Sequence, residues 1–186
     1  MVSKSLLSEQ VVAAWLLILS GIIFLPGGLF FTGRAIFKWP TAQSQGYLYW
    51  ERGFVMASFI TAVLGLVLLD SLLQAAGDTI LSPIGLAIFL IGTVLMMVAE
   101  TFSLSRREWS YAPIVTFVVL AFVGQAVFGA SLLRTGLAPG WIGWATIIWN
   151  LAWLIILPVA RPNEIYYPWL HFVGPLMIGI TLLLKG

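Results

Sequence analysis

Long apolar stretches with almost no charge dominate this sequence, and they constrain the fold more than any other feature. The hydrocarbon core of a bilayer is about 30 Å thick, and a helix rises about 1.5 Å per residue. A helix therefore needs about 20 apolar residues to cross it. A segment surrounded by lipid must also satisfy its own backbone hydrogen bonds, as a helix does. The qualifying segments are 11–32, 53–76, 82–103, 112–134, 139–160 and 165–185. The sequence therefore predicts an all-α, polytopic integral membrane protein, a bundle of six transmembrane helices in a single domain over 1–186.

The composition supports a membrane location and excludes several classes of function. Hydrophobic residues make up 61% of the chain and charged residues 9%, whereas a soluble domain carries about 25% charged residues. The absence of cysteine excludes disulfides, thiolate nucleophiles and cysteine metal sites. With a single histidine, we expect no metal and no cofactor, although a bound lipid or apolar ligand is compatible with the sequence. Basic residues are scattered at segment ends, so nucleic acid is not an expected partner.

Charge at the segment ends predicts an orientation. The connections after the odd-numbered segments carry Arg34, Lys38, Arg52, Arg106, Arg107 and Arg161. The opposite side carries Lys4, Arg134 and Lys185. The excess of basic residues predicts cytoplasmic odd-numbered loops and both termini outside. The first apolar run is longer than the 7–15 residues of a signal peptide core, so we expect it to be a retained span.

The connection 33–52 mixes aromatic and charged residues, which predicts an interfacial loop that is partly helical. A weak similarity between FTGRA (31–35) and RTGLA (134–138) raises the hypothesis of a 3+3 inverted repeat. The segments YLYWERGF (47–54) and LGLVLLD (64–70) are similar to small bacterial membrane proteins. That resemblance implies a bacterial inner membrane and no particular function.

Ionisable residues at membrane depth are the first candidates for function, because they are costly there unless they are paired. Glu100, His171 and Arg52 are predicted at similar depth near the odd-loop face. They could form a proton relay or a general acid–base pair, or a structural ion pair that ties three helices together. Pro175 removes the helical hydrogen bond to the carbonyl of His171, so this site has spare polarity. We expect His171 to face the interior and to bond Glu100, a polar group of the fifth span or a water.

Asp70 is a third catalytic candidate, predicted near the opposite face of the membrane. Gln74 follows one turn later on the same helical face, and Arg134 ends the fourth segment on that side. The sequence favours an Asp70–Arg134 ion pair, direct or through Gln74. Two acidic centres at opposite ends would suit a pathway across the bundle, and would equally suit two unrelated stabilising pairs.

The remaining candidates are uncharged. Gln125 and Asn150 lie near the middles of two segments and, with Arg134 and Arg52, are assigned to a polar interior. Such amides more often join helices than bind substrates. Trp149 and Trp153 share one helical face and could form an aromatic wall for a cation, a polyisoprenoid or a pigment, or simply pack.

Three function classes remain after this reading. The favoured one is a non-catalytic membrane subunit or small binding module, because no catalytic motif is present and each polar residue has a structural explanation. The alternative is a transporter or channel for a small solute or proton that uses Asp70, Glu100 and His171. The third is a membrane-embedded enzyme acting on an isoprenoid or lipid. The expected partners are the bilayer and either other proteins or further copies of the chain.

Overall fold

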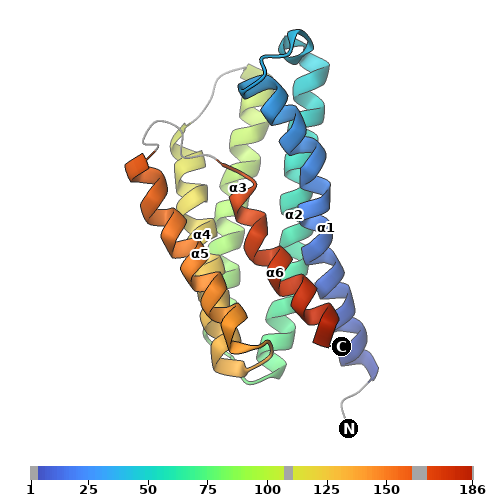
Figure 1. Ribbon diagram of the computed structural model, residues 1–186, viewed down its shortest axis with the longest axis vertical. Helices are drawn as coiled ribbons and strands as arrows, with labels where there is room; N and C mark the ends of the chain where they lie inside the picture. The colour runs from blue at the N-terminus through green and yellow to red at the C-terminus, as the bar shows by residue number, and fades with distance from the viewer. Residues whose placement is uncertain (1–3, 107–110, 161–166, 186) are drawn as a thin grey trace.

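The described residues form six α-helices and one short 3₁₀-helix, arranged as a bundle in which the long helices run roughly along the same axis (Figure 1). The computed structural model describes residues 4–106, 111–160 and 167–185. The elements are α1 (Lys4–Ala35), η1 (Pro40–Gln43), α2 (Gln45–Ala75), α3 (Leu81–Arg106), α4 (Tyr111–Thr135), α5 (Gly140–Ala160) and α6 (Leu170–Lys185). The described ranges contain no strand. The all-α expectation is therefore confirmed.

Five of these helices, α1 to α5, are long and apolar enough to cross a membrane. The sixth, α6, is a shorter apolar helix of 16 residues that begins at Leu170, five positions later than the sequence suggested. Pro168 lies just ahead of it, and a proline is suited to the start of a helix rather than to its interior. Residues 161–166, where the sixth span was expected to start, lie outside the described residues.

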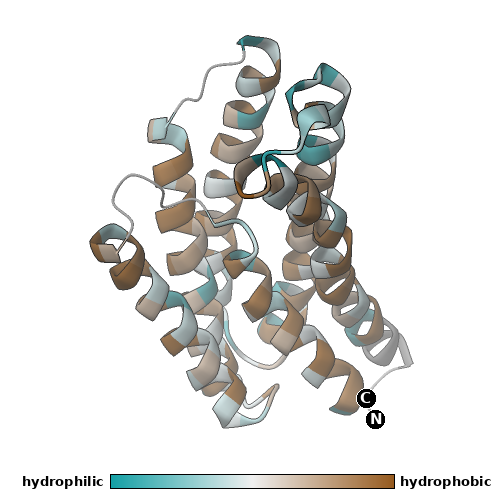
Figure 2. Cartoon of the chain, turned by 45° about the horizontal axis from the view of Figure 1, so that its top comes forward, coloured by the Kyte–Doolittle hydropathy of each residue, from teal (hydrophilic) through white to brown (hydrophobic). Residues whose placement is uncertain are grey.

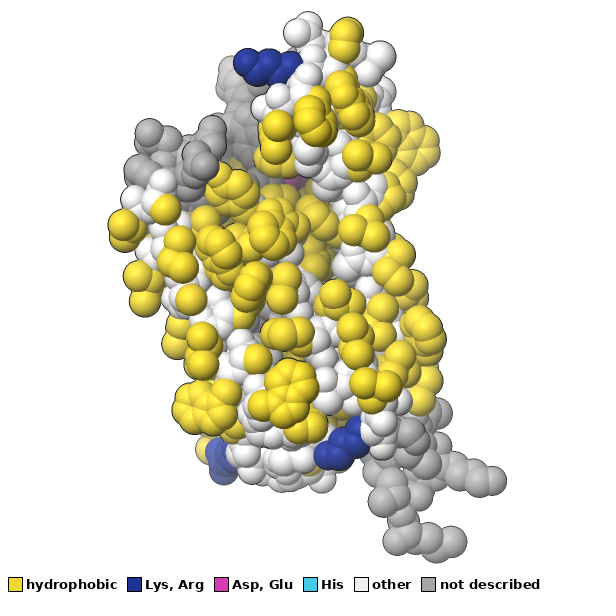
Figure 3. All heavy atoms as spheres, viewed as in Figure 1, with side chains coloured by type: hydrophobic (Ala, Val, Ile, Leu, Met, Phe, Trp, Pro, Cys, Tyr) yellow, Lys and Arg dark blue, Asp and Glu magenta, His cyan; other side chains and the backbone are white. Residues whose placement is uncertain are grey.

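The outside of the bundle is apolar over most of its length. Figure 3 shows hydrophobic side chains across the middle of the visible face and basic side chains only near its two ends. The colouring by hydropathy in Figure 2 likewise places many of the hydrophilic residues at the α1–α2 connection. Large exposed apolar side chains include Leu25, Ile91, Val98, Ile148 and Ile155. Such a surface is compatible with a multi-pass membrane protein, since lipid tails can cover it.

Helix pairs approach closely where glycine removes the side chain. A Cβ on Gly129 of α4 would lie 2.8 Å from the carbonyl oxygen of Gly143 on α5, and one on Gly124 would lie 2.8 Å from that of Gly85 on α3. Real Cβ atoms do not approach so closely, so these glycines set the spacing of α3, α4 and α5. Both glycines of α4 thus lie at helix contacts.

The first and last helices also pack together. A Cβ on Gly179 of α6 would lie 2.8 Å from the Ala14 carbonyl of α1. Gln10 donates a hydrogen bond of 2.8 Å to the carbonyl of Leu182. The start of α1 and the end of α6 lie at the same end of the bundle, opposite the α1–α2 connection (Figure 1).

The interfacial loop expected at 33–52 is largely helical, and its second half belongs to α2. Ser44 caps α2 by accepting a hydrogen bond of 3.3 Å from the Tyr47 N–H. The sequence predicts that this loop extends to Arg52, because charged residues usually lie outside a span. The structure instead buries Glu51 and Arg52 within α2, and the ion pairs described below explain how.

Candidate functional site

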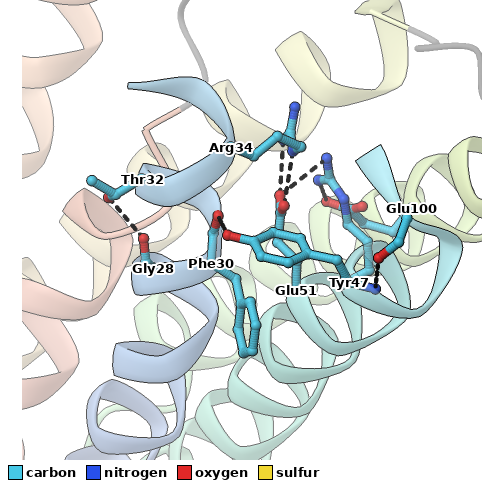
Figure 4. Close-up of polar contacts among 9 residues, drawn as sticks. Gly28, Phe30, Thr32, Arg34, Tyr47, Glu51 and Glu100 are labelled. Carbon is cyan, nitrogen blue, oxygen red and sulfur yellow. Dashed lines mark hydrogen bonds and ion pairs between the residues drawn. The ribbon is translucent and has the colours of Figure 1, made fainter. Parts of the chain in front are cut away.

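A chain of four charged side chains joins three helices at the α1–α2 end of the bundle (Figure 4). Arg34 of α1 donates two hydrogen bonds of 2.8 Å to Glu51 of α2, one to each carboxylate oxygen. Arg52 of α2 lies 3.4 Å from Glu51 and donates a hydrogen bond of 2.9 Å to Glu100 of α3. Two cations and two carboxylates therefore alternate across α1, α2 and α3.

These charges are strongly buried. Glu51 and Glu100 are 0% exposed and Arg52 is 2% exposed, while the Arg34 side chain keeps 26% of its surface. An isolated buried ion costs several kcal/mol, so each member of the chain depends on its neighbour. The Oε2 atom of Glu100 has no hydrogen-bond partner among the residues that the structure describes. The network thus ties the helices together while retaining an unused acceptor.

Packing of aromatic rings against α1 holds the first link of the network in place. The Tyr47 hydroxyl donates a hydrogen bond of 2.6 Å to the Phe30 carbonyl, and the two rings meet edge to face at 4.8 Å (Figure 4). Gly33 makes this approach possible, because a Cβ there would collide with the Trp39 ring and the Tyr47 hydroxyl. The last turn of α1 therefore sits directly against the start of α2, and Arg34 reaches Glu51.

A cavity of about 490 Å³ opens beside this network. It is lined by residues from α1, the segment after it, α2 and α3: Arg34, Lys38, Trp39, Ala42, Gln43, Leu48, Arg52 and Ser103. We call it the basic pocket. Its three charged lining residues are all cations, whereas the carboxylates that balance two of them are buried and do not line it. The pocket therefore offers positive charge to whatever enters it.

Lys38 stands out within the basic pocket because of its backbone. Its φ is +50°, which is uncommon for a residue other than glycine. Hydrogen bonds from Phe37 to the Thr32 carbonyl (3.1 Å) and from Trp39 to the Gly33 carbonyl (2.9 Å) hold the turn that ends α1. Within the described ranges, the Lys38 ammonium has no hydrogen-bond or ion-pair partner.

His171 does not join Glu100. The imidazole is 1% exposed and lies among phenylalanine rings, with centroids 4.3 Å from Phe122 and 5.1 Å from Phe117. Neither of its nitrogens has a hydrogen-bond partner among the described residues. The imidazole faces the interior, as expected. Of the expected partners, Glu100 is turned towards Arg52 and no polar group of α5 bonds the ring.

The freed carbonyl expected at His171 has a partner. Gln125 of α4 donates a hydrogen bond of 2.9 Å to it. The carbonyl of the preceding residue, Leu170, accepts a hydrogen bond of 3.0 Å from the indole N–H of Trp149 on α5. Side chains of α4 and α5 thus hold the first turn of α6, and Gln125 acts as a helix-joining amide.

The other uncharged candidates also lie inside the bundle. Asn150 is 0% exposed and donates 2.7 Å to the Thr146 carbonyl of its own helix. Trp149 and Trp153 form an edge-to-face pair at 5.7 Å and pack against the core. The aromatic wall is therefore present as a contact between two rings, and nothing beside it identifies a ligand.

At the opposite end, the expected Asp70–Arg134 ion pair is replaced by another. Asp70 accepts a hydrogen bond of 2.7 Å from the side chain of Gln74. Arg134 lies 3.7 Å from the carboxylate of Asp78, a residue of the connection between α2 and α3. The Arg134 side chain is 51% exposed, so its assignment to the polar interior does not describe its position. The last turn of α4 brings Arg134 to the connection 76–80 rather than to the buried face of α2.

Asp78 also caps α3. Its carboxylate accepts hydrogen bonds of 3.0 to 3.1 Å from the N–H groups of residues 80–82. Burial alone would raise the pKa of the Asp78 carboxyl, but these N–H donors favour the charged form, and the pKa is below the ordinary 3.8. Asp78 is 0% exposed, and its negative charge stabilises the N-terminus of α3.

Sequence reasoning missed Glu51 and Asp78, and placed Arg34 and Lys38 only as orientation charges. Glu51 was assigned to a surface loop, although its position beside Arg52 and 17 residues after Arg34 was visible. Asp78 lies four residues before Ser82, and its carboxylate accepts a hydrogen bond from the Ser82 N–H. No group of three or more His, Asp or Glu side chains within 4–106, 111–160 and 167–185 is placed to hold a metal ion.

Comparisons with protein-family models, with curated proteins and with solved structures find no match to this chain. The class of protein therefore follows from the fold alone. An apolar helical bundle with five helices of membrane-crossing length is compatible with a multi-pass membrane protein and suggests a membrane location.

Proposed function

We propose that the chain is a six-span membrane protein that acts as a non-catalytic binding module, with the basic pocket as its ligand site. In this proposal α6 and the residues before it form the sixth span, as the length of the apolar segment 165–185 favours. The observation that carries the proposal is the charge arrangement of the pocket. Three cations line it, while both compensating carboxylates lie behind them and are inaccessible.

This arrangement favours an anionic ligand. Glu51 pairs with Arg34 and Glu100 pairs with Arg52, whereas Lys38 has no such partner among the described residues, so one cation of the lining remains without a counter-charge. Gln43 and Ser103 add polar groups to the lining. A pocket of about 490 Å³ is within the usual 300–1,000 Å³ of small-molecule sites.

The transporter and enzyme readings find less support in the geometry. A pathway needs its acidic groups to share one space, yet Glu100 bonds Arg52, Asp70 bonds Gln74 and the imidazole of His171 is enclosed by phenylalanine rings. An acid–base pair needs both groups within hydrogen-bond reach, and Glu100 and His171 are not bonded to each other. The binding reading requires only residues that already meet in the basic pocket.

Thermal stability of the purified protein tests the proposal. A ligand that binds only the folded state raises the unfolding midpoint. We expect at least one anion from a series of inorganic phosphate, glycerol phosphate and phosphatidylglycerol to raise the midpoint, and Lys38→Ala to reduce that rise. Arg106→Ala removes the same charge at the same end of the bundle but outside the pocket, so it is the matched control. If no anion acts through Lys38, the proposal is wrong.

We also propose that the basic pocket faces the cytoplasm, because the excess of Lys and Arg lies on that side of the chain. The absence of cysteine allows single-cysteine labelling without background. In intact cells, a membrane-impermeant thiol reagent should modify Thr79→Cys, between α2 and α3, and spare Gln43→Cys in η1. The reverse pattern would place the pocket outside.

A further inference from the structure

We infer that the ligand of the basic pocket is the phosphodiester headgroup of an anionic glycerolipid. The inference rests on the proposed function, and it adds the chemical class of the ligand. Three features of the structure support it: the residual charge, the donors left unused, and the mixed polar and apolar lining.

The residual charge selects a monoanion. Three cations against two buried carboxylates leave a single positive charge, which one phosphodiester neutralises. Inorganic phosphate is about half dianionic near neutral pH, and an additional charge in a partly buried site is costly. A phosphodiester with one charge and two free oxygens is therefore the better match.

Unused donors are available where a phosphate would lie. Arg34 binds Glu51 through Nε and Nη2, which leaves Nη1 without a hydrogen-bond partner in the described part of the chain. Lys38 contributes its whole ammonium group. A guanidinium edge and an ammonium together suit phosphate oxygens, because both form charge-assisted hydrogen bonds. The left-handed backbone at Lys38 is compatible with a ligand role, since strained residues persist where a functional position requires them.

The lining of the pocket changes from polar to apolar within a few residues. Trp39, Ala42 and Leu48 share it with the cations. A tryptophan beside basic groups is typical of the level of lipid headgroups in a membrane. A free anion gains nothing from these side chains, whereas the glycerol portion of a lipid can pack on them.

Binding of defined lipids to the purified full chain tests the inference. The protein in neutral detergent is titrated separately with phosphatidylglycerol, phosphatidylcholine, glycerophosphoglycerol and inorganic phosphate, and bound ligand is counted by native mass spectrometry. We expect phosphatidylglycerol to bind at least about tenfold more tightly than the zwitterionic lipid and than either soluble probe, because only it combines one net charge with acyl chains.

Lys38→Gly is the diagnostic variant. Glycine adopts a φ of +50° without strain, so the unfolding midpoint should stay the same or rise while the pocket loses a charge. We expect phosphatidylglycerol binding to weaken by about fivefold or more, the usual effect of one basic residue near an anionic lipid. Arg106→Ala should leave the binding constant within about twofold.

Each other outcome has a distinct meaning. If the soluble probes bind as tightly as the lipid and depend on Lys38, the pocket binds anions but the lipid inference is wrong. If Arg106→Ala weakens lipid binding as much as Lys38→Gly, the attraction is general surface charge and the inference is wrong. If no probe depends on Lys38, the inference and the proposed function both fail.

Discussion

Gln125 on α4 donates a hydrogen bond of 2.9 Å to the backbone carbonyl of His171 on α6, an acceptor that Pro175 leaves without its helical donor. A side chain of one helix thus replaces a backbone bond of another. Because Gly174 has no Cβ, the carboxamide can approach; a Cβ there would lie 2.7 Å from the Gln125 oxygen.

This bond predicts a rescue. Gln125→Leu should lower the free energy of unfolding by about 1–3 kcal/mol, because it leaves a buried carbonyl unsatisfied. Adding Pro175→Ala supplies an N–H four residues after His171 and should recover part of the loss. Unfolding in mixed micelles, followed by circular dichroism, measures both variants. A double variant no more stable than Gln125→Leu would contradict the proposed exchange of donors.

The Arg52–Glu100 pair predicts strong coupling. Glu100→Leu leaves a buried guanidinium short of a carboxylate and should cost about 3–5 kcal/mol, whereas Arg52→Leu combined with Glu100→Leu should cost clearly less than the sum of the single changes. A double-mutant cycle in the same unfolding assay gives the interaction free energy. Arg106→Leu, outside the network, is the control and should change stability little. Additive single changes would show that the pair is not coupled.

The acidic centre at the other end predicts the opposite result for Asp70 and Arg134. Asp70 bonds Gln74, and Arg134 is half-exposed near Asp78, so the two share no contact. Asp70→Leu and Arg134→Leu should therefore add within about 0.5 kcal/mol. An interaction free energy above about 1 kcal/mol in the double-mutant cycle would support the Asp70–Arg134 ion pair that the sequence predicts.

Asp78 predicts a pH-dependent stability. Its pKa is lowered in the folded state, so its contribution is fully present above the unfolded pKa near 3.8 and is lost as the pH falls through the folded value. Asp78→Asn should destabilise the protein at pH 7, and its difference from wild type should shrink below about pH 3.8. Asp78→Ala, which also removes the cap, should cost about 1 kcal/mol more at neutral pH. A difference that is constant from pH 7 to pH 3 would exclude the charge effect.

His171 predicts that an aromatic ring can replace it. The imidazole nitrogens have no partners among the described residues, and phenylalanine rings surround them. His171→Phe removes buried polar atoms that cost about 1–3 kcal/mol, against a smaller penalty for the larger ring. The unfolding midpoint should therefore stay the same or rise. A large fall would show that the imidazole makes a polar contact essential to the fold.

The sequence predicts those features that depend on local rules. Apolar segments of sufficient length identify the helices, and Pro175 identifies the freed carbonyl of His171, because both arguments need only a few adjacent residues. The charge network depends on residues 17 and 48 positions apart, so Glu51 resembles the end of a loop until Arg34 is placed beside it. The same limit explains the wrong partner for Arg134. Which acid it meets depends on how α4 is rotated against α2 and α3.

The contact between α1 and α6 has a consequence for biogenesis. Gln10 donates a hydrogen bond to the carbonyl of Leu182, which is synthesised 172 residues later, so this contact forms only near the end of synthesis. Until α6 is made, the face of α1 around Ala14 lacks its partner, Gly179 of α6. The finished bundle therefore forms only after the last helix docks on the first.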